Sequence, residues 1–196
     1  TFIAKLLHSS PTSVQWDWAI NAGGSDDEEG YGIAVDSSGN AYVTGYFVGT
    51  ATFGNTNMTS SGNTDIFVAK LNSSGSWQWA ASAGGTNYGY AYGIVVDSNG
   101  NAFVTGPFLG NFSFGTTTLS SGSGHDIYLA KIGANGTWMW ASEANTISTT
   151  LYRVDASHAI TLDGNDNVYI TGYCDGDISF GGSLNYTCSA AIFAAR

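Results

Sequence analysis

Oxygen-bearing side chains at alternate positions are the first candidates for chemistry in this sequence. Asp163, Asn165 and Asn167 have the spacing of the first ligands in a calcium loop. The downstream bidentate Glu of such a loop is missing, and the equivalent segments 36–40 and 97–101 carry Ser and Gly within the pattern. We therefore expect Asp163 to cap a turn, with a calcium site as the alternative reading.

The densest charge in the chain is the acidic run Asp26, Asp27, Glu28 and Glu29. A run of this kind usually forms a solvated loop, and a weak cation site is the alternative. We expect the loop.

The histidines do not form a recognisable site. His8, His125 and His158 show no metal-ligand spacing such as His-x-x-x-His. No Gly-x-Ser-x-Gly elbow, phosphate loop or Cys–His pair is present. We expect no catalytic residue, no enzymatic activity and no cofactor.

Tryptophans occur in pairs whose members are two residues apart. Residues two apart share one face of a strand, so each pair could stack on a sugar in a lectin-like site, or pack against a neighbouring layer or subunit. We favour packing and keep glycans as the alternative partners. The pairs are Trp16/Trp18, Trp77/Trp79 and Trp138/Trp140.

Cys174 and Cys188 stand close together in the sequence, and we expect a disulfide between them, with a reactive thiol as the alternative. Asn-x-Ser/Thr sequons also permit N-glycosylation if the chain is secreted. These sequons begin at Asn57, Asn72, Asn111, Asn135 and Asn185.

Composition favours strands and argues against several partners. The 196 residues are 43% hydrophobic and 14% aromatic but only 10% charged, which is not the composition of a disordered chain. A net charge of −10 makes nucleic acid and anionic membranes poor partners. No apolar run reaches the roughly 20 residues of a membrane span, and we recognise no signal peptide. Low charge and the close Cys pair favour an extracellular protein.

The sequence contains an internal repeat, and the residues named above occupy positions within it. The segment 31–36 recurs 61 residues later at 92–97, and a weaker copy follows after 66 more at 158–163. Other matching segments follow in the same order within each copy. They are 40–45, 101–106 and 167–172; Phe53-Gly54, Phe114-Gly115 and Phe180-Gly181; and 65–70 and 126–131.

Each copy contains four short segments rich in Val, Ile, Tyr, Phe and Trp, which we name strands a to d. In the first copy they cover 31–36, 41–47, 65–71 and 77–82. Glycine-containing turns separate a from b and c from d, which predicts tight hairpins. We predict an all-β fold of tandem four-stranded antiparallel, β-propeller-like blades, with about three circularly permuted repeats of 61–66 residues.

Residues 31–45 and 65–71, with the Trp-x-Trp between copies, resemble the SBBP family of β-propeller repeats over essentially the whole chain. The resemblance implies a propeller fold on a secreted or surface protein, and no particular reaction. The third copy departs most from the pattern. It has extra residues before Asp163, and Ala191 stands where the other copies have Asp.

A basic residue recurs near the end of each strand c. A catalytic residue is seldom needed once per blade, so we expect structural ion pairs with carboxylates such as Asp36 or Asp97. The recurring residues are Lys5, Lys70, Lys131 and Arg196.

The chain is out of phase with its repeat. We expect residues 1–22 to be strands c and d, 23–83 and 84–144 to be complete blades, and 145–196 to lack a strand d. The N-terminal strand d could complete the last blade, as in a circular permutation.

About three blades are fewer than the four to eight typical of propellers, which would leave blade faces open. We expect other copies, in a head-to-tail filament or ring, or further repeats of a longer chain, to cover them. The leading hypothesis is therefore an extracellular structural or adhesive protein. A carbohydrate- or ligand-binding module and a fragment of a larger secreted propeller enzyme are the alternatives.

Overall fold

The computed structural model describes residues 1–10, 13–122, 124–146, 154–188 and 191–195, and within them every named element is a β-strand. The named strands pair antiparallel. The described residues contain no helix that is long and apolar enough to cross a membrane. The predicted all-β fold of antiparallel, blade-like units is confirmed.

The N-terminal segment is a hairpin whose two strands pair with each other. Lys5 lies opposite Trp18, and a β-bulge follows at Asp17. The same register recurs in the c and d strands of both later blades, at Lys70–Trp79 and Lys131–Trp140. The hairpin therefore has the structure of a c–d pair, formed by β1 (Phe2–Ser10) and β2 (Ser13–Asn21).

Three further blades follow along the chain, and strands a, b, c and d lie side by side in that order. The first is β3 (Glu28–Val35), β4 (Ala41–Phe47), β7 (Asp65–Leu71) and β8 (Trp77–Gly85). The second is β9 (Gly93–Val96), β10 (Ala102–Phe108), β13 (Asp126–Ile132) and β14 (Trp138–Thr146). In the third, the described strands are β15 (Ala156–Leu162), β16 (Val168–Cys174) and β19 (Ala191–Ala195).

In addition to the four predicted strands, each copy contains a small hairpin between strands b and c that the sequence analysis did not predict. A tight turn with Gly54 in the left-handed region (φ 62°) closes the first of them. The hairpins are β5 (Thr50–Phe53) with β6 (Thr56–Thr59), β11 (Asn111–Phe114) with β12 (Thr117–Ser120), and β17 (Asp177–Ser179) with β18 (Asn185–Thr187).

These hairpins connect successive blades. β11 pairs with β8, and β17 pairs with β14, so each six-stranded sheet begins in one blade and ends in the hairpin of the next. At the first of these connections Phe112 lies opposite Gly85. A Cβ on Gly85 would collide with the backbone carbonyl oxygen of Asn111, so the close approach of the two strands requires glycine.

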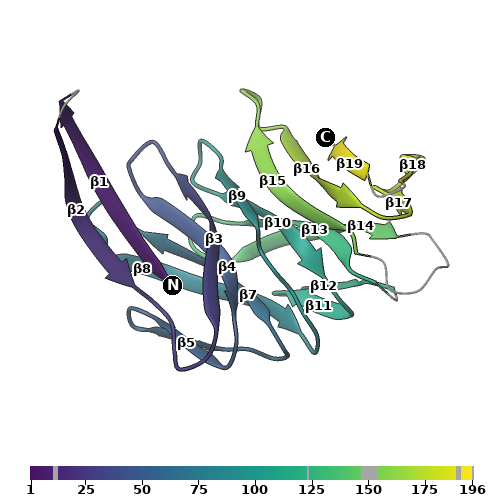
Figure 1. The fold of residues 1–196 in the computed structure, drawn as a ribbon, viewed down its shortest axis with the longest axis horizontal. Helices are drawn as coiled ribbons and strands as arrows, with labels where there is room; N and C mark the ends of the chain where they lie inside the picture. The colour runs from purple at the N-terminus through teal and green to yellow at the C-terminus, as the bar shows by residue number, and fades with distance from the viewer. Residues whose placement is uncertain (11–12, 123, 147–153, 189–190, 196) are drawn as a thin grey trace.

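The blades are arranged as an open arc in Figure 1, with the β1–β2 hairpin at one end and β19 towards the other. The a strands β3, β9 and β15 lie next to one another across the middle. In the described residues, β19 pairs with β16 and β2 pairs with β1. The suggested completion of the last blade by the N-terminal strand d is therefore not seen within this chain.

Hydrophobic clusters fill the spaces between consecutive blades. Tyr42 and Val68 of the first blade pack with Val104, Tyr128 and Ile132 of the second. Corresponding clusters lie between the N-terminal hairpin and the first blade, and between the second and third blades. The central strands are consequently buried on both faces, which is why they read as continuous apolar runs.

Candidate functional site

The second tryptophan of a pair forms part of the joint with the next blade. Trp18 Nε1 donates a hydrogen bond to the carbonyl oxygen of Ser73 at 3.2 Å, and Trp79 Nε1 to that of Ala134 at 2.9 Å. The acceptors lie in the c–d turns of the following blades. A Cβ on Gly75 in the first of these turns would lie 2.8 Å from the Trp18 ring, so glycine lets the ring pack on the backbone.

The first tryptophan of a pair packs in a different cluster. The Trp77 ring meets the ring of Phe53 at 5.3 Å and 87°, and the Trp138 ring meets that of Phe114 at 5.1 Å and 86°. A β-bulge lies between the two tryptophans of each pair, so they do not form one platform as their spacing suggested. Trp16 in the N-terminal hairpin is 67% exposed, and Trp140 on β14 of the second blade is 37% exposed.

In the two complete blades, the repeated lysine forms an ion pair with the aspartate of the a–b turn. Lys131 Nζ lies 3.1 Å from Asp97, and Lys70 Nζ lies 3.9 Å from Asp36. Lys5 instead pairs with Asp17 of its own hairpin at 2.9 Å. Arg196, the fourth member of the set, lies outside the described residues.

Asp97 is a buried carboxylate that organises its turn. It accepts hydrogen bonds from the backbone N–H groups of Asn99 and Asn101 and from the Asn101 side chain. Burial alone would raise the pKa of Asp97, but the hydrogen bonds from Asn101, Lys131 and Asn99 outweigh burial and hold this pKa below its usual value. The same balance lowers the pKa of Asp36.

The candidate calcium loop has the same turn geometry. Asp163 accepts hydrogen bonds from the N–H groups of Asn165 and Asn167 and from Asn167 Nδ2 at 2.7 Å. Hydrogen bonds from Asn167 and Asn165 lower the pKa of Asp163 to about 2. The carboxylate therefore caps the turn. Among the described residues, no group of three His, Cys, Asp or Glu side chains could hold a metal ion.

The acidic run makes local contacts. Glu28 Oε1 accepts the N–H of Gly24 at 2.7 Å, Asp26 lies 3.5 Å from the Ser25 hydroxyl, and the backbone carbonyl of Asp27 accepts the N–H of Val48. The expected loop covers only Asp26 and Asp27, because Glu28 and Glu29 begin β3 and pair with Phe47 and Tyr46 of strand b.

The three histidines lie in different surroundings. His8 is exposed on β1, and His158 is exposed on β15. His125 is partly buried, and its burial lowers the pKa of the ring. The structure does not bring these three side chains together.

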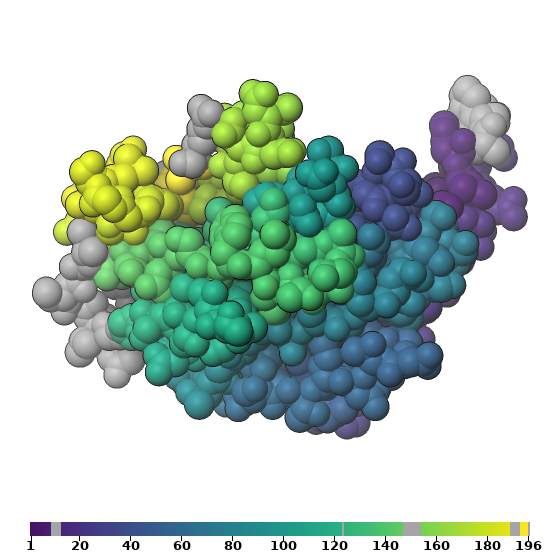
Figure 2. All heavy atoms as spheres, turned by 180° about the vertical axis from the view of Figure 1, so that it is seen from behind, coloured from purple at the N-terminus to yellow at the C-terminus, as the bar shows by residue number. Residues whose placement is uncertain are grey.

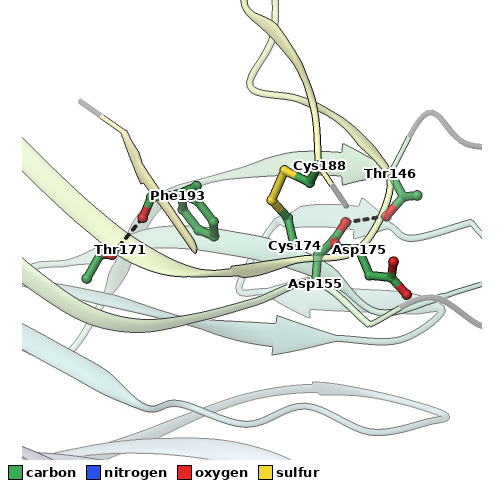
Figure 3. Close-up of a disulfide and its surroundings, with 7 residues drawn as sticks. All are labelled: Thr146, Asp155, Thr171, Cys174, Asp175, Cys188 and Phe193. Atoms are coloured by element: carbon green, nitrogen blue, oxygen red, sulfur yellow. Dashed lines mark hydrogen bonds between the residues drawn. A yellow bond between two sulfur atoms is a disulfide. The ribbon is translucent and has the colours of Figure 1, made fainter. Parts of the chain in front are cut away.

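Cys174 and Cys188 form a disulfide with a Cα–Cα distance of 5.8 Å (Figure 3). It closes the base of the β17–β18 hairpin, where Gly176 and Cys188 also exchange two backbone hydrogen bonds. Next to it, the buried Asp155 accepts the N–H of Asp175 and the hydroxyl of Thr146, as Figure 3 shows. By closing a short loop, the disulfide stabilises the folded state by on the order of 3 kcal/mol.

The sequon asparagines occur on strands and turns at the surface. Asn72 is half-buried, and its side chain caps the c–d turn by accepting the N–H groups of Ser74 and Ser76. The other four are exposed: Asn57, Asn111, Asn135 and Asn185.

An aromatic cluster along the inner strands was not foreseen from the sequence. We call it the inner aromatic row, and it consists of Tyr31, Tyr46, Tyr90, Tyr92 and His158. The Tyr31 and Tyr92 rings meet edge to face at 5.1 Å, and the His158 ring stacks on Tyr92 at 5.3 Å and 8°. Tyr46 and Tyr90 meet at 5.3 Å.

A repeat signal for this row was present in the sequence. Tyr31, Tyr92 and His158 occupy one position in strand a of the three copies, so adjacent inner strands bring their rings together. Burial raises the pKa of the Tyr31 hydroxyl, and a hydrogen bond to Glu29 raises it further. Tyr46 has a raised pKa for the same first reason, with added repulsion from the charges of Glu29 and Asp27.

Comparison with known proteins agrees with this geometry. Residues 20–46 and 78–106 match the SBBP family, described as a beta-propeller repeat. The resemblance seen in the sequence is thereby confirmed over these two stretches. The chain is also 25% identical over 205 aligned positions to "Uncharacterized WD repeat-containing protein L264" of Acanthamoeba polyphaga mimivirus. That alignment covers 87% of the chain and 14% of the relative, so the chain spans about one seventh of its length.

Proposed function

We propose that this chain, built from SBBP-type blades, is an extracellular structural protein that assembles by joining the open blade face at one end to another copy. The function is non-enzymatic. The main support is the difference in exposure between two isoleucines that occupy the same position of the repeat. Ile94 is 7% exposed, because strand a of the preceding blade covers it, whereas Ile33 is 58% exposed.

The N-terminal hairpin explains the exposure of Ile33. In the complete blades strand c pairs with strand b on one side and with strand d on the other. β1 has the register of a strand c, and in the described residues it pairs with β2 alone. An a–b pair added to its free edge would continue the sheet and lie over β3, as β3 and β4 lie over the second blade.

Apolar side chains surround the position that such a pair would occupy. Phe2 is 79% exposed and Val35 is 62% exposed. A groove of about 180 Å³ lies between β1 and β3, with Thr1, Ile3 and Tyr31 in its walls. Burying the exposed parts of Phe2, Ile33 and Val35 would contribute on the order of 3–6 kcal/mol, at about 1.5–3 kcal/mol for each fully buried side chain.

Trp140 is a second aromatic side chain that a partner could cover. Trp79 donates its hydrogen bond to the c–d turn of the next blade. Trp140, at the equivalent position on β14, meets the ring of Phe103 at 6.0 Å and is 37% exposed. Figure 2 shows the two ends of the arc well separated, with the N-terminal hairpin projecting at one side. Ends that are separate and different favour a head-to-tail filament or ring.

Two further features support an extracellular location. The Cys174–Cys188 disulfide is compatible with an oxidising compartment. Most of the sequon asparagines are exposed, so they are accessible for glycosylation.

Light scattering across a dilution series tests the proposal. We expect a mass above 20.4 kDa that falls on dilution. Ile33→Asp should weaken assembly at least tenfold, because it puts a charge in the apolar contact. Thr116→Asp, an exposed position in the turn of the β11–β12 hairpin, is the control for added charge. A monomeric wild-type chain at every concentration would contradict inter-chain assembly.

A second candidate function is ligand binding at the inner aromatic row. The observation that favours it is the exposed surface of contiguous rings, of which Tyr31 is 45% exposed. The joint tryptophans Trp18 and Trp79 are engaged between blades, so a ligand-binding surface fits the row better than the Trp pairs. A glycan array tests for sugars, with Tyr31→Ala as the variant that must lose binding.

A further inference from the structure

We propose that the inner aromatic row binds an organic cation through an alkyl-substituted ammonium group. This inference rests on the second candidate function and names its ligand class. Because Tyr31 also lines the groove between β1 and β3, the binding test is made at a dilution at which the chain is monomeric.

The four tyrosines of the row form a closed circuit of ring contacts. Tyr31 and Tyr46 have centroids 5.9 Å apart, and Tyr90 and Tyr92 are also 5.9 Å apart. Edge-to-face contacts join the two pairs, Tyr31 with Tyr92 and Tyr46 with Tyr90. The circuit brings four rings to one patch of surface, where Tyr31 is 45% exposed and the other three tyrosines are half-buried.

Carboxylates at the start of β3 add charge of the same sign. Glu29 lies opposite Tyr46 in the pairing of β3 with β4, and its charge also acts on Tyr31. The charges of Asp27 and Glu28 also act on Tyr46. Because rings and carboxylates both favour positive charge, the patch selects a cation over a neutral ligand such as a sugar.

The described lysines are committed elsewhere. Lys5, Lys70 and Lys131 form ion pairs with Asp17, Asp36 and Asp97. Those pairs lie in the N-terminal hairpin and at the a–b turns, away from the start of strand a where the row lies. None of the three lysines therefore occupies the row.

An alkylated ammonium fits better than a bare metal ion. Its charge is spread over apolar groups that can contact ring faces, and it is the cation type that aromatic surfaces recognise best. The row also lacks three convergent ligand side chains of the kind a metal ion needs, as judged over the described part of the chain.

Titration of the full chain with choline, followed by the aromatic proton resonances in NMR, tests the proposal. We expect saturable shifts with a Kd on the order of 1 mM. The neutral isostere 3,3-dimethylbutanol should bind at least tenfold more weakly. Equal binding of the two probes, or no saturable shift with choline, would overturn the proposal.

Variants locate the site. Tyr31→Leu should weaken choline binding about tenfold and Glu29→Gln about fivefold, whereas Tyr31→Phe, which keeps the ring, should bind nearly as well as wild type. Tyr186→Leu removes an exposed ring on β18, and Asp166→Asn removes a charge in the third a–b turn. An equal loss with either control would show a non-specific effect and refute the site.

Two outcomes separate this inference from the function on which it rests. Binding of a neutral sugar that Tyr31→Leu abolishes, without choline binding, would keep ligand binding and refute the cation. If choline binds, phosphatidylcholine vesicles distinguish its source: co-sedimentation of the chain assigns the ammonium group to a lipid headgroup, and its absence assigns a free ligand.

Discussion

At the scale of single residues, one carboxylate organises each turn between strands a and b. Asp36, Asp97 and Asp163 make the same set of hydrogen bonds to the backbone and to an Asn side chain. Lysine partners are present for the first two. The repeat therefore forms the same carboxylate-capped turn in each copy.

Asp97→Asn should destabilise the fold by about 2 kcal/mol at pH 7, because it removes the charge that pairs with the half-buried Lys131. The folded-state pKa of Asp97 is lowered. Its stabilisation is therefore full above the unfolded pKa of about 3.9 and is lost as pH falls through the lower folded value.

Urea denaturation of wild type and variant at several pH values measures this difference. It should be constant from pH 7 to about 5 and should shrink below about pH 4. A difference that grows on acidification would contradict the assignment.

Asp166 is a strained position, because it has φ 60° where the first two copies have Gly39 and Gly100, both at φ 78°. Asp166→Gly should stabilise the chain by about 0.5–1 kcal/mol by relieving the left-handed conformation. The reciprocal change, Gly39→Asp, should cost a similar amount. Thermal unfolding should show a higher melting temperature for Asp166→Gly and a lower one for Gly39→Asp. A lower melting temperature for Asp166→Gly would refute the explanation.

At the scale of elements, strands a to d could be predicted because runs such as Ile66–Val68 in strand c are apolar on both sides of the sheet. The b–c hairpins were missed because Thr, Ser and Asn dominate them, so they resemble loops. Their stabilising partner is a strand of the preceding blade, which no local pattern reveals. The repeated Phe53-Gly54 was the available signal, since it marks the first hairpin turn.

Some of the candidate sites could be predicted from the sequence and others could not. The turn at Asp163 and the disulfide at Cys174 could be predicted because both depend on short sequence separations. The separate packing of Trp77 and Trp79 depends on a bulge, and the inner aromatic row depends on contacts between blades. Neither feature is visible in a single copy of the repeat.

Gly85→Val should destabilise the chain by about 2–4 kcal/mol, because a side chain there collides with the β11 backbone and breaks the connection between blades. Gly164→Ala is the matched control, since nothing lies within 4 Å of its added Cβ. Urea titrations of the two variants give the comparison. Equal effects would mean that the β8–β11 pairing contributes little to stability.

At the scale of the whole molecule, each blade depends on its neighbours, because the cores lie between blades. The described residues accordingly have buried clusters between blades and exposed apolar side chains, such as Ile33 and Val35, on the outer face of the first blade. Ile94, which lies between two blades, is buried, whereas Ile33 at the same repeat position has no blade over it and is exposed. A partner that supplies the same kind of strand would make the end resemble the middle.

Hydrogen–deuterium exchange of β1, measured at low and high protein concentration, tests this claim most directly. If another copy adds a strand to the free edge of β1, the amides of residues 2–8 should become protected as concentration rises, while those of the central strand β10 stay equally protected. Unchanged exchange in β1 over a concentration range that spans any change in mass would contradict the account.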